Sequence, residues 1–180
     1  MTSIRQINFD DLFKFNALVF DPLTEVYGLG FFLRHIIQWP ELTRIAFAPN
    51  GQSMGYIFGK CTGPNMERLH GHICALTVSA EYRRLGLASA LMALFALELD
   101  LKRAWYVDLF VRQSNVNAYK LYSSLGYIQR RLLLDYYPGT TPENAYNMRK
   151  ALARDVEGGT VAHISTQPEY LSEQEEQEYH

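Results

Sequence analysis

Hydrophobic and polar positions follow two different periods along this 180-residue chain. Short segments with period-two alternation and β-branched or aromatic residues predict strands, whereas longer runs with apolar residues three and four apart predict helices. Strands are expected at residues 4–9, 43–48, 53–60, 70–79, 104–111, 127–137 and 146–150, the last as an edge strand. Helices are expected at residues 10–21, 30–38, 88–99 and 115–124. This order predicts an α+β fold, one sheet with helices on both faces.

Composition limits the classes of protein that fit the chain. Its length suits one domain with a full hydrophobic core. The N-terminal residues do not resemble a signal peptide, and no apolar run approaches the roughly 20 residues of a membrane span. The two cysteines, Cys61 and Cys74, lack metal-ligand spacing, so we expect neither a disulfide scaffold nor a metal site and favour a reducing, cytoplasmic setting.

The net charge of −2 is distributed unevenly. Residues 155–180 contain seven acidic side chains and no Lys or Arg, which leaves residues 1–154 with a net charge of +5. A moderately basic domain suits an anionic ligand, but without a clustered basic stripe it does not indicate nucleic-acid binding. We therefore expect a folded domain over residues 1–154 and an acidic, disordered tail over residues 155–180.

A basic, glycine-containing loop separates the strand at residues 70–79 from the helix at 88–99. It reads Arg83-Arg84-Leu85-Gly86-Leu87-Ala88. Free backbone N–H groups at a helix start, together with the helix dipole, favour an anion such as a diphosphate. The loop matches neither the Walker phosphate loop nor the dinucleotide fingerprint.

The spacing Arg-x-x-Gly-x-Ala of this loop resembles the pyrophosphate-binding loop of the GCN5-related N-acetyltransferases (GNAT). A second motif of that family follows about 30 residues later as Asn115-x-x-Ala118-x-x-x-Tyr122-x-x-x-Gly126-Tyr127. The resemblance implies the GNAT fold, a mixed central sheet of about seven strands with four helices on both faces. It also implies acetyl-CoA as co-substrate and no metal.

Within that superfamily, residues 1 to about 154 resemble the catalytic subunits of N-terminal acetyltransferase B (NatB). The segments that carry this resemblance are residues 10–16, 21–28, 56–60, 107–112, 135–137 and 147–152. The resemblance implies acetylation of nascent chains that begin Met-Asp, Met-Glu, Met-Asn or Met-Gln. It also implies a large helical auxiliary subunit, through which the enzyme reaches the ribosome.

The reaction is attack of a free amine on a thioester, and an α-amine with a pKa of about 7.7–8.0 needs no strong base. Positioning and stabilisation of the oxyanion should therefore dominate catalysis. The resemblance implies a splayed strand whose Leu76 amide meets the acetyl carbonyl, and a Tyr122 hydroxyl near the CoA sulfur. Asn115 suits a helix N-cap and a cofactor contact. The residues expected at acetyl-CoA are Leu76, Thr77, Val78, Arg83, Arg84, Leu85, Gly86, Leu87, Ala88, Ser89, Asn115, Asn117 and Tyr122.

The acceptor peptide is expected between two aromatic walls. One is the loop with Glu25, Tyr27 and Gly28, and the other is Tyr136-Tyr137. Cys74, Ala75 and Phe110 are expected to complete this half of the site. His72 is interpreted as a catalytic proton relay or a contact to an acidic second residue, and Asp108 as structural.

Two other functions remain compatible with the sequence. The same fold serves acetyltransferases of small amines, and it serves CoA-binding subunits without activity. Tyr122, Asn115 and the intact loop favour an active enzyme. The aromatic walls favour a peptide, because a polyamine site is expected to be acidic.

Overall fold

The computed structural model describes residues 2–17, 27–63, 65–66, 68–172 and 175. Its sheet has seven strands in the order β1-β2-β3-β4-β5-β7-β6. The strands are β1 (Ser3–Gln6), β2 (Thr43–Phe47), β3 (Ser53–Thr62), β4 (His70–Val78), β5 (Tyr106–Arg112), β6 (Ile128–Tyr137) and β7 (Glu143–Ala151). Neighbouring strands are antiparallel except β4 and β5, so the predicted mixed sheet is confirmed.

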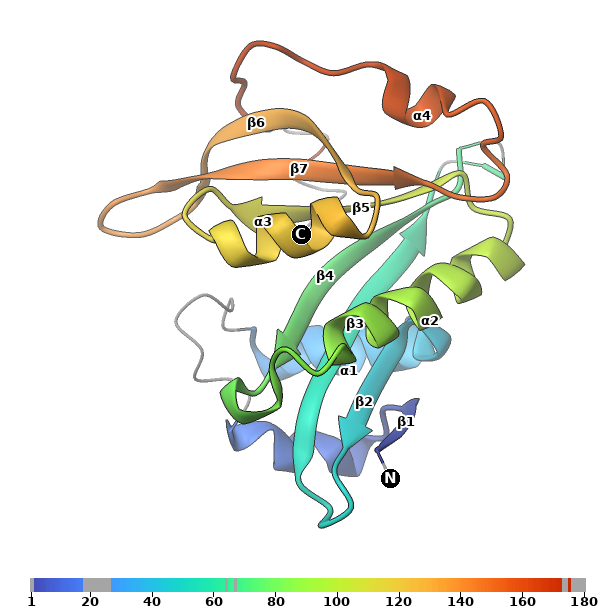
Figure 1. The fold of residues 1–180 in the computed structure, drawn as a ribbon, viewed down its shortest axis with the longest axis vertical. Helices are drawn as coiled ribbons and strands as arrows, with labels where there is room; N and C mark the ends of the chain where they lie inside the picture. Colours follow the sequence, from blue (N-terminus) through green and yellow to red (C-terminus); the bar gives the residue numbers. More distant parts are fainter. Residues whose placement is uncertain (1, 18–26, 64, 67, 173–174, 176–180) are drawn as a thin grey trace.

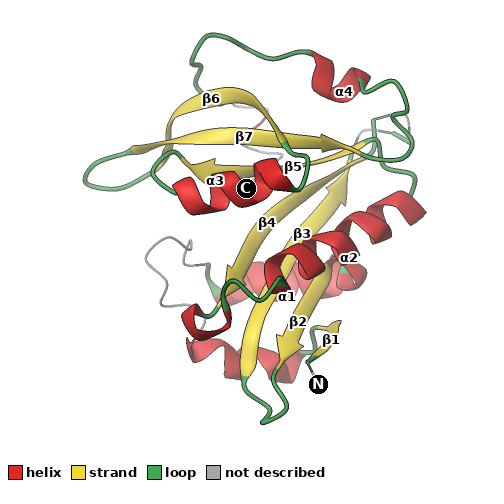
Figure 2. Ribbon diagram, viewed as in Figure 1, coloured by secondary structure: helices red, strands yellow, loops and turns green. Residues whose placement is uncertain are grey.

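The described helices flank this sheet. They are the α-helices α1 (Leu29–Gln38), α2 (Leu87–Leu101), α3 (Val116–Ser124) and α4 (Gly159–Ala162), and the 3₁₀ helices η1 (Phe9–Ala17), η2 (Pro40–Leu42) and η3 (Ala80–Tyr82). In Figures 1 and 2, α2 and α3 lie in front of the sheet, and α1 and η1 lie behind it.

Two hydrophobic cores form on the opposite faces of the sheet. Because side chains alternate along β3, Ile57 packs in the core with Phe95 of α2, while Tyr56 and Phe58 pack in the core with Phe32 of α1. This two-sided burial explains why β3 is almost continuously buried along its length.

The first expected helix is a 3₁₀ helix over Phe9–Ala17, and residues 18–21 of the prediction lie outside the described residues. Asp11 explains the tight geometry at its start. The Asp11 carboxylate accepts hydrogen bonds from the Asn8 amide at 2.9 Å and from the Arg5 guanidinium at 2.6 and 2.8 Å. Such local side-chain bonds compete with regular helical bonding.

The prediction of residues 146–150 as an edge strand is wrong. β7 pairs with β5 on one side and β6 on the other, and β6 is the edge. The polar residues of β7 led to the wrong prediction, because polar side chains are typical of an exposed edge. Asn147 is nevertheless buried and donates a 3.4 Å hydrogen bond to the Leu109 carbonyl.

The described part of the acidic tail packs against the domain. Asp155 accepts hydrogen bonds from the amides of Gly159 and Thr160 at 2.9 and 2.8 Å, at the start of α4. The chain then turns back over β6, where Leu133 and Glu169 form a parallel β-bridge. The edge of β6 that faces away from β7 offers backbone N–H and C=O groups to this segment. Composition alone does not reveal such partners.

Candidate active site

A cleft opens where β4 and β5 part. The two strands pair only from Gly71 with Val107 to Ile73 with Leu109, after which β5 continues beside β7. At the same point the register between β3 and β4 shifts, which makes Cys74 an extra, bulged residue of β4. The resulting cleft has a volume of about 740 Å³. The divergence agrees with the splayed strand implied by the family resemblance.

The loop between β4 and α2 forms one half of this cleft. Gly86 stands at the N-cap of α2 with φ +77°, and a Cβ built there would meet no atom within 4 Å. Backbone can therefore be approached closely at Gly86, and the first amides of α2 have no partner within the helix. Arg83, Arg84, Gly86, Leu87, Ala88 and Ser89 line the cleft. This arrangement suits a diphosphate, the group that links the two parts of CoA.

Leu85 is the exception in this loop. Its side chain is 68% exposed and does not line the cleft, so its predicted cofactor contact is not supported. The residues on either side of it, Arg84 with φ +62° and Gly86, are both left-handed, and both line the cleft.

Helix α3 brings the second motif to the same cleft. The Asn115 Oδ1 accepts a 3.1 Å hydrogen bond from the Ala118 amide and so caps the helix, as its position predicts. Asn115, Asn117 and Tyr122 all line the cleft, as do Leu76, Thr77 and Val78 of β4. Tyr122 is buried, and burial raises the pKa of its hydroxyl to about 12.

Aromatic side chains line the other half of the cleft. Tyr27, Phe110 and Tyr137 line it together with Cys74 and Ala75. We call Phe110, Tyr136 and Tyr137 the acceptor wall. The Tyr136 ring does not line the cleft but packs 4.5 Å from the Phe110 ring.

Two further residues predicted near the acceptor are placed differently or not described. Gly28 is the N-cap of α1 and does not line the cleft. Glu25 lies outside the described residues.

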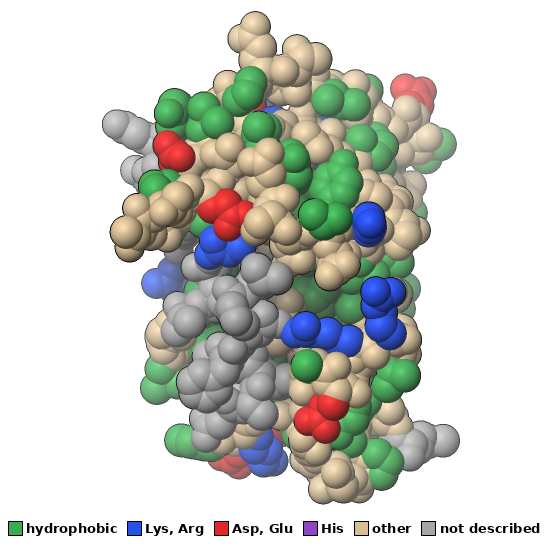
Figure 3. Space-filling model, turned by 60° about the vertical axis from the view of Figure 1, so that its left-hand side comes forward, with side chains coloured by type: hydrophobic (Ala, Val, Ile, Leu, Met, Phe, Trp, Pro, Cys, Tyr) green, Lys and Arg blue, Asp and Glu red, His purple; other side chains and the backbone are tan. Residues whose placement is uncertain are grey.

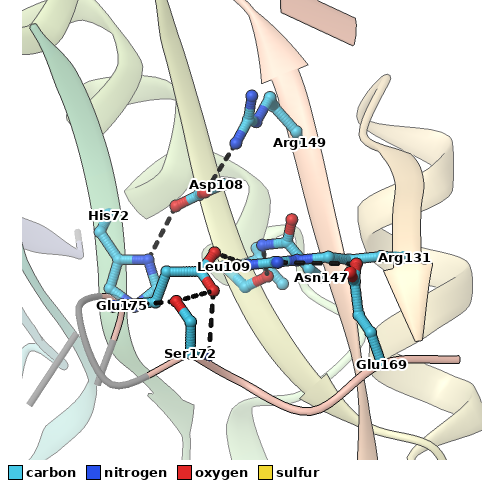
Figure 4. A network of polar contacts seen from close by, with 9 residues as sticks. All are labelled: His72, Asp108, Leu109, Arg131, Asn147, Arg149, Glu169, Ser172 and Glu175. Carbon is cyan, nitrogen blue, oxygen red and sulfur yellow. Dashed lines mark hydrogen bonds and ion pairs between the residues drawn. The ribbon is translucent and has the colours of Figure 1, made fainter. Parts of the chain in front are cut away.

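His72 does not reach the cleft, contrary to its predicted contact with substrate. It is 3% exposed, and its Nδ1 lies 2.8 Å from the Asp108 carboxylate, which also contacts Arg149 at 3.4 Å (Figure 4). Burial lowers the pKa of His72, while these partners lower that of Asp108 to about 2. An ionised carboxylate only accepts, so neutral His72 donates its Nδ1 hydrogen to Asp108. Asp108 is buried and contacts both His72 and Arg149.

The residues that line the cleft but were not predicted as site residues include Tyr82, Arg112 and Lys120. No local pattern marks them, because the direction of each side chain depends on how its element is placed. The described lining residues include four Lys or Arg side chains and no Asp or Glu. Figure 3 shows Lys and Arg gathered beside a hollow on this side of the molecule.

The described residues provide no group of three or more His, Cys, Asp or Glu that could hold a metal ion. Within the same part of the chain, no helix has the length and apolarity needed to cross a membrane.

Comparison with known proteins decides the family. The model of the acetyltransferase (GNAT) family matches residues 12–127. The chain is 45% identical over 162 residues to the N-terminal acetyltransferase B complex catalytic subunit NAA20 of Arabidopsis thaliana, covering 89% of this chain and 91% of that protein. The chain belongs to the GNAT family, among the NatB catalytic subunits. It is thus an acetyl-CoA-dependent N-terminal acetyltransferase, as the resemblance implied.

Other relatives agree with this assignment. N-alpha-acetyltransferase 20 of Dictyostelium discoideum is 45% identical over 162 residues, covering 89% of this chain and 92% of that protein. The crystal structure of Chaetomium thermophilum Naa20 with a bisubstrate analogue superposes with a TM-score of 0.82 at 36% identity, covering 93% of this chain and 94% of that chain. A NatB complex bound to CoA and MES gives 0.76 at 37% identity, covering 83% and 99%.

Proposed function

We propose that this chain acetylates the α-amine of peptides that begin Met-Asp, Met-Glu, Met-Asn or Met-Gln. The observation that carries the proposal is the charge of the cleft, whose described lining has no acidic side chain and, beside Arg83 and Arg84 at the diphosphate, contains Lys120 and Arg112, the latter paired with Glu143. A site for polyamines needs carboxylates, whereas an acceptor with an acidic second residue is attracted by this lining. The similarity to NatB catalytic subunits supports the same substrate class.

The residues of the chain have separable roles in this reaction. When bound, acetyl-CoA supplies an acetyl group activated as a thioester. The amides at Gly86–Ser89 hold the diphosphate, assisted by Arg83 and Arg84. The Leu76 amide, on the part of β4 that β5 has left, donates to the acetyl oxygen as it becomes negative. The amine itself needs only partial deprotonation near neutral pH.

Tyr122 assists the sulfur by donating a hydrogen bond. Full proton transfer from a hydroxyl with a pKa of about 12 to a thiolate of about 8.5 is uphill by roughly 5 kcal/mol. A hydrogen bond to the developing thiolate requires no such transfer. The raised pKa also keeps the hydroxyl protonated throughout the physiological range.

In this proposal His72 does not contact the substrate and acts through Phe110. Its ring lies 5.1 Å from that of Phe110, whose side chain lines the cleft. Since His72 is neutral and donates to Asp108, it positions Phe110 instead of pairing with a substrate carboxylate. The acidic second residue is instead attracted by the cationic lining and by the amides of the splayed part of β4.

The chain works with a large auxiliary subunit, through which it reaches nascent chains at the ribosome in the cytoplasm. Solved relatives include NatB complexes. The sequence places more apolar residues on the first two helices than one core face needs. Phe32 and Ile36 are buried, while Phe9, Phe13, Leu29 and Ile37 stay between 51% and 83% exposed. We assign this exposed apolar surface of η1 and α1 to the auxiliary subunit.

A panel of peptides that differ only in residues 1 and 2 tests the substrate assignment. The catalytic efficiency for Met-Asp and Met-Glu should exceed that for Met-Leu and Ser-Ala by on the order of 100-fold, because polar groups built to bind a side chain are left unpaired by apolar analogues. Met-Asn and spermidine complete the panel. Faster turnover of Met-Leu, Ser-Ala or spermidine would overturn the NatB-type specificity but leave the family assignment intact.

A further inference from the structure

The C-terminal residues cover the open edge of β6. We call residues 165–172 together with Glu175 the C-terminal strap. The Glu169 amide donates a 3.1 Å hydrogen bond to the Leu132 carbonyl, and the Leu134 amide donates a 2.9 Å bond to the Glu169 carbonyl. The strap thus adds a parallel, strand-like segment to the edge of the sheet.

The strap pairs where β6 is irregular. Between Leu133 and Tyr137 the register of β6 against β7 shifts, so several β6 residues face a shorter stretch of β7. Asp135, within this bulge, has φ +51°, a conformation that is costly for a residue with a side chain. The bulge therefore depends on outside partners, and it carries Tyr136 and Tyr137 of the acceptor wall.

Two freed amides of the bulge receive their partners from different elements. The Asp135 amide donates a 3.1 Å hydrogen bond to Asn144 Oδ1 at the start of β7. The Leu134 amide has its bond to the Glu169 carbonyl of the strap. The strap thus completes the hydrogen bonding that orients the acceptor wall.

An apolar contact joins the strap to the same wall. Leu171 packs against a small core formed by Leu133, Tyr137 and Ala145, to which Phe110 and Tyr136 also belong. Since Phe110 and Tyr137 line the cleft, Leu171 supports the wall from behind.

Charges hold the end of the strap in place. Ser172 and Glu175 form a reciprocal cap, in which the Ser172 amide donates to Glu175 Oε2 at 3.1 Å and the Glu175 amide donates to Ser172 Oγ at 3.4 Å. Arg131, whose side chain is 17% exposed, then pairs with Glu175 at 2.5 Å and Glu169 at 3.6 Å (Figure 4). Across the sheet, Arg131 of β6 is in register with Asn147 of β7, and Asn147 is in register with Phe110 of β5. The ion pairs of Arg131 therefore lie at the same level of the sheet as Phe110 of the acceptor wall.

We propose that the C-terminal strap positions the acceptor wall, so that Leu171 and Glu175 are positioning residues for the peptide substrate. The inference rests on the proposed function only in taking this half of the cleft as the peptide site. Acetyl-CoA binding, which uses the opposite half, is independent of the strap.

Steady-state kinetics of the full chain test the proposal with the double variant Leu171→Ala/Glu175→Gln. The KM for a Met-Asp peptide should rise on the order of tenfold with little change in kcat, as expected when binding alone is weakened. The KM for acetyl-CoA should stay within about twofold. The single variant Leu171→Met conserves the side-chain volume and leaves Glu175 unchanged. Its peptide KM should be close to that of the wild type. Glu157→Gln removes an acidic residue before the strap and serves as the matched control.

Hydrogen exchange gives a readout that does not depend on turnover. The Leu134 amide should exchange faster in the double variant, while amides of β2 and β3 keep their protection. An unchanged peptide KM with an unchanged Leu134 amide would overturn the proposal, and a lowered peptide KM would make the strap a competitor of substrate. If the wild-type chain shows no preference for Met-Asp peptides, the proposed function is contradicted. The hydrogen-exchange result for the strap would still be valid.

Discussion

The hydroxyl of Tyr27 donates a 2.8 Å hydrogen bond to the carbonyl oxygen of Cys74. Cys74 is the bulged residue of β4, and the Tyr27 ring stacks on Phe31 of α1 with centroids 3.9 Å apart. The bond therefore ties the segment that enters α1 to the irregular strand at the centre of the cleft.

Tyr27→Phe should weaken peptide acetylation while preserving the ring stack. Loss of one hydrogen bond worth about 1 kcal/mol predicts a roughly fivefold fall in kcat/KM for the peptide. The KM for acetyl-CoA should not change. Tyr119→Phe on α3, which removes a 3.2 Å hydrogen bond to Gln129 of β6, is the matched control and should leave both parameters unchanged. A Tyr27→Phe enzyme with unaltered peptide kinetics would contradict this role.

Gly86→Val should raise the KM for acetyl-CoA sharply, on the order of tenfold or more, because a β-branched side chain blocks close approach to the backbone amides. The positive φ also makes the substitution strained. Gly51→Val has the same strain, with φ +82° and open space around it, but lies in the turn between β2 and β3. Equal effects of the two variants on the KM for acetyl-CoA would contradict the assignment of this loop to the acetyl-CoA site.

Tyr122→Phe should lower kcat on the order of 100-fold, because the variant loses the hydrogen bond to the departing sulfur. Stability should change little, since the ring and its packing remain. Tyr127→Phe is the control, as this buried tyrosine lies 6.0 Å from Tyr122 between ring centroids and does not line the cleft. A fall in kcat of less than about threefold would reduce Tyr122 to a packing role.

Asp108→Asn should make the protein less stable and change how stability depends on pH. Because the folded pKa of Asp108 is lowered to about 2, its carboxylate stabilises the fold above pH 4 and loses this effect as the pH falls toward 2. The pH-dependent part amounts to about 2 kcal/mol. The lowered pKa of His72 adds a loss of stability as the pH falls below its ordinary value of 6.5.

Urea unfolding from pH 7 to pH 2 measures this effect. The wild type should lose stability through both windows. Asp108→Asn should lose about 2 kcal/mol less between pH 4 and pH 2, where other carboxylates with a lowered pKa, such as those of Asp11 and Asp155, still titrate. Asp10→Asn, at an exposed position, should behave as wild type. A wild-type acid profile for Asp108→Asn would exclude the buried pair as its source.

Phe13→Ser combined with Ile37→Ser should weaken binding to the NatB auxiliary subunit at least about tenfold and make the lone chain more soluble. Phe13 is 83% exposed and Ile37 67%. Leu101→Ser, which changes a 72% exposed residue at the end of α2, is the control. A monodisperse, fully active lone chain would argue against this surface as the docking site.

Local patterns in the sequence were sufficient for much of the acetyl-CoA half of the site. The arginine-rich loop, the glycine at the start of α2 and the cap at Asn115 act within a few residues of themselves, so their spacing predicts their geometry. The period of apolar residues likewise determined six of the strands and three of the helices closely. The family and its co-substrate follow from these local features.

Long-range pairing decided the rest. β7 enters the sheet between β5 and β6, and the acidic tail docks on the edge that this leaves open. The bulge at Cys74 reverses which face later β4 residues occupy, so Ile73 and Ala75 belong to opposite cores. The alternation of apolar and polar residues in a strand does not reveal whether one residue is bulged. The sequence of an edge strand likewise does not reveal whether a distant segment covers that edge. Therefore the burial of His72, the cationic lining of the cleft and the support of the acceptor wall could be decided only by tertiary structure.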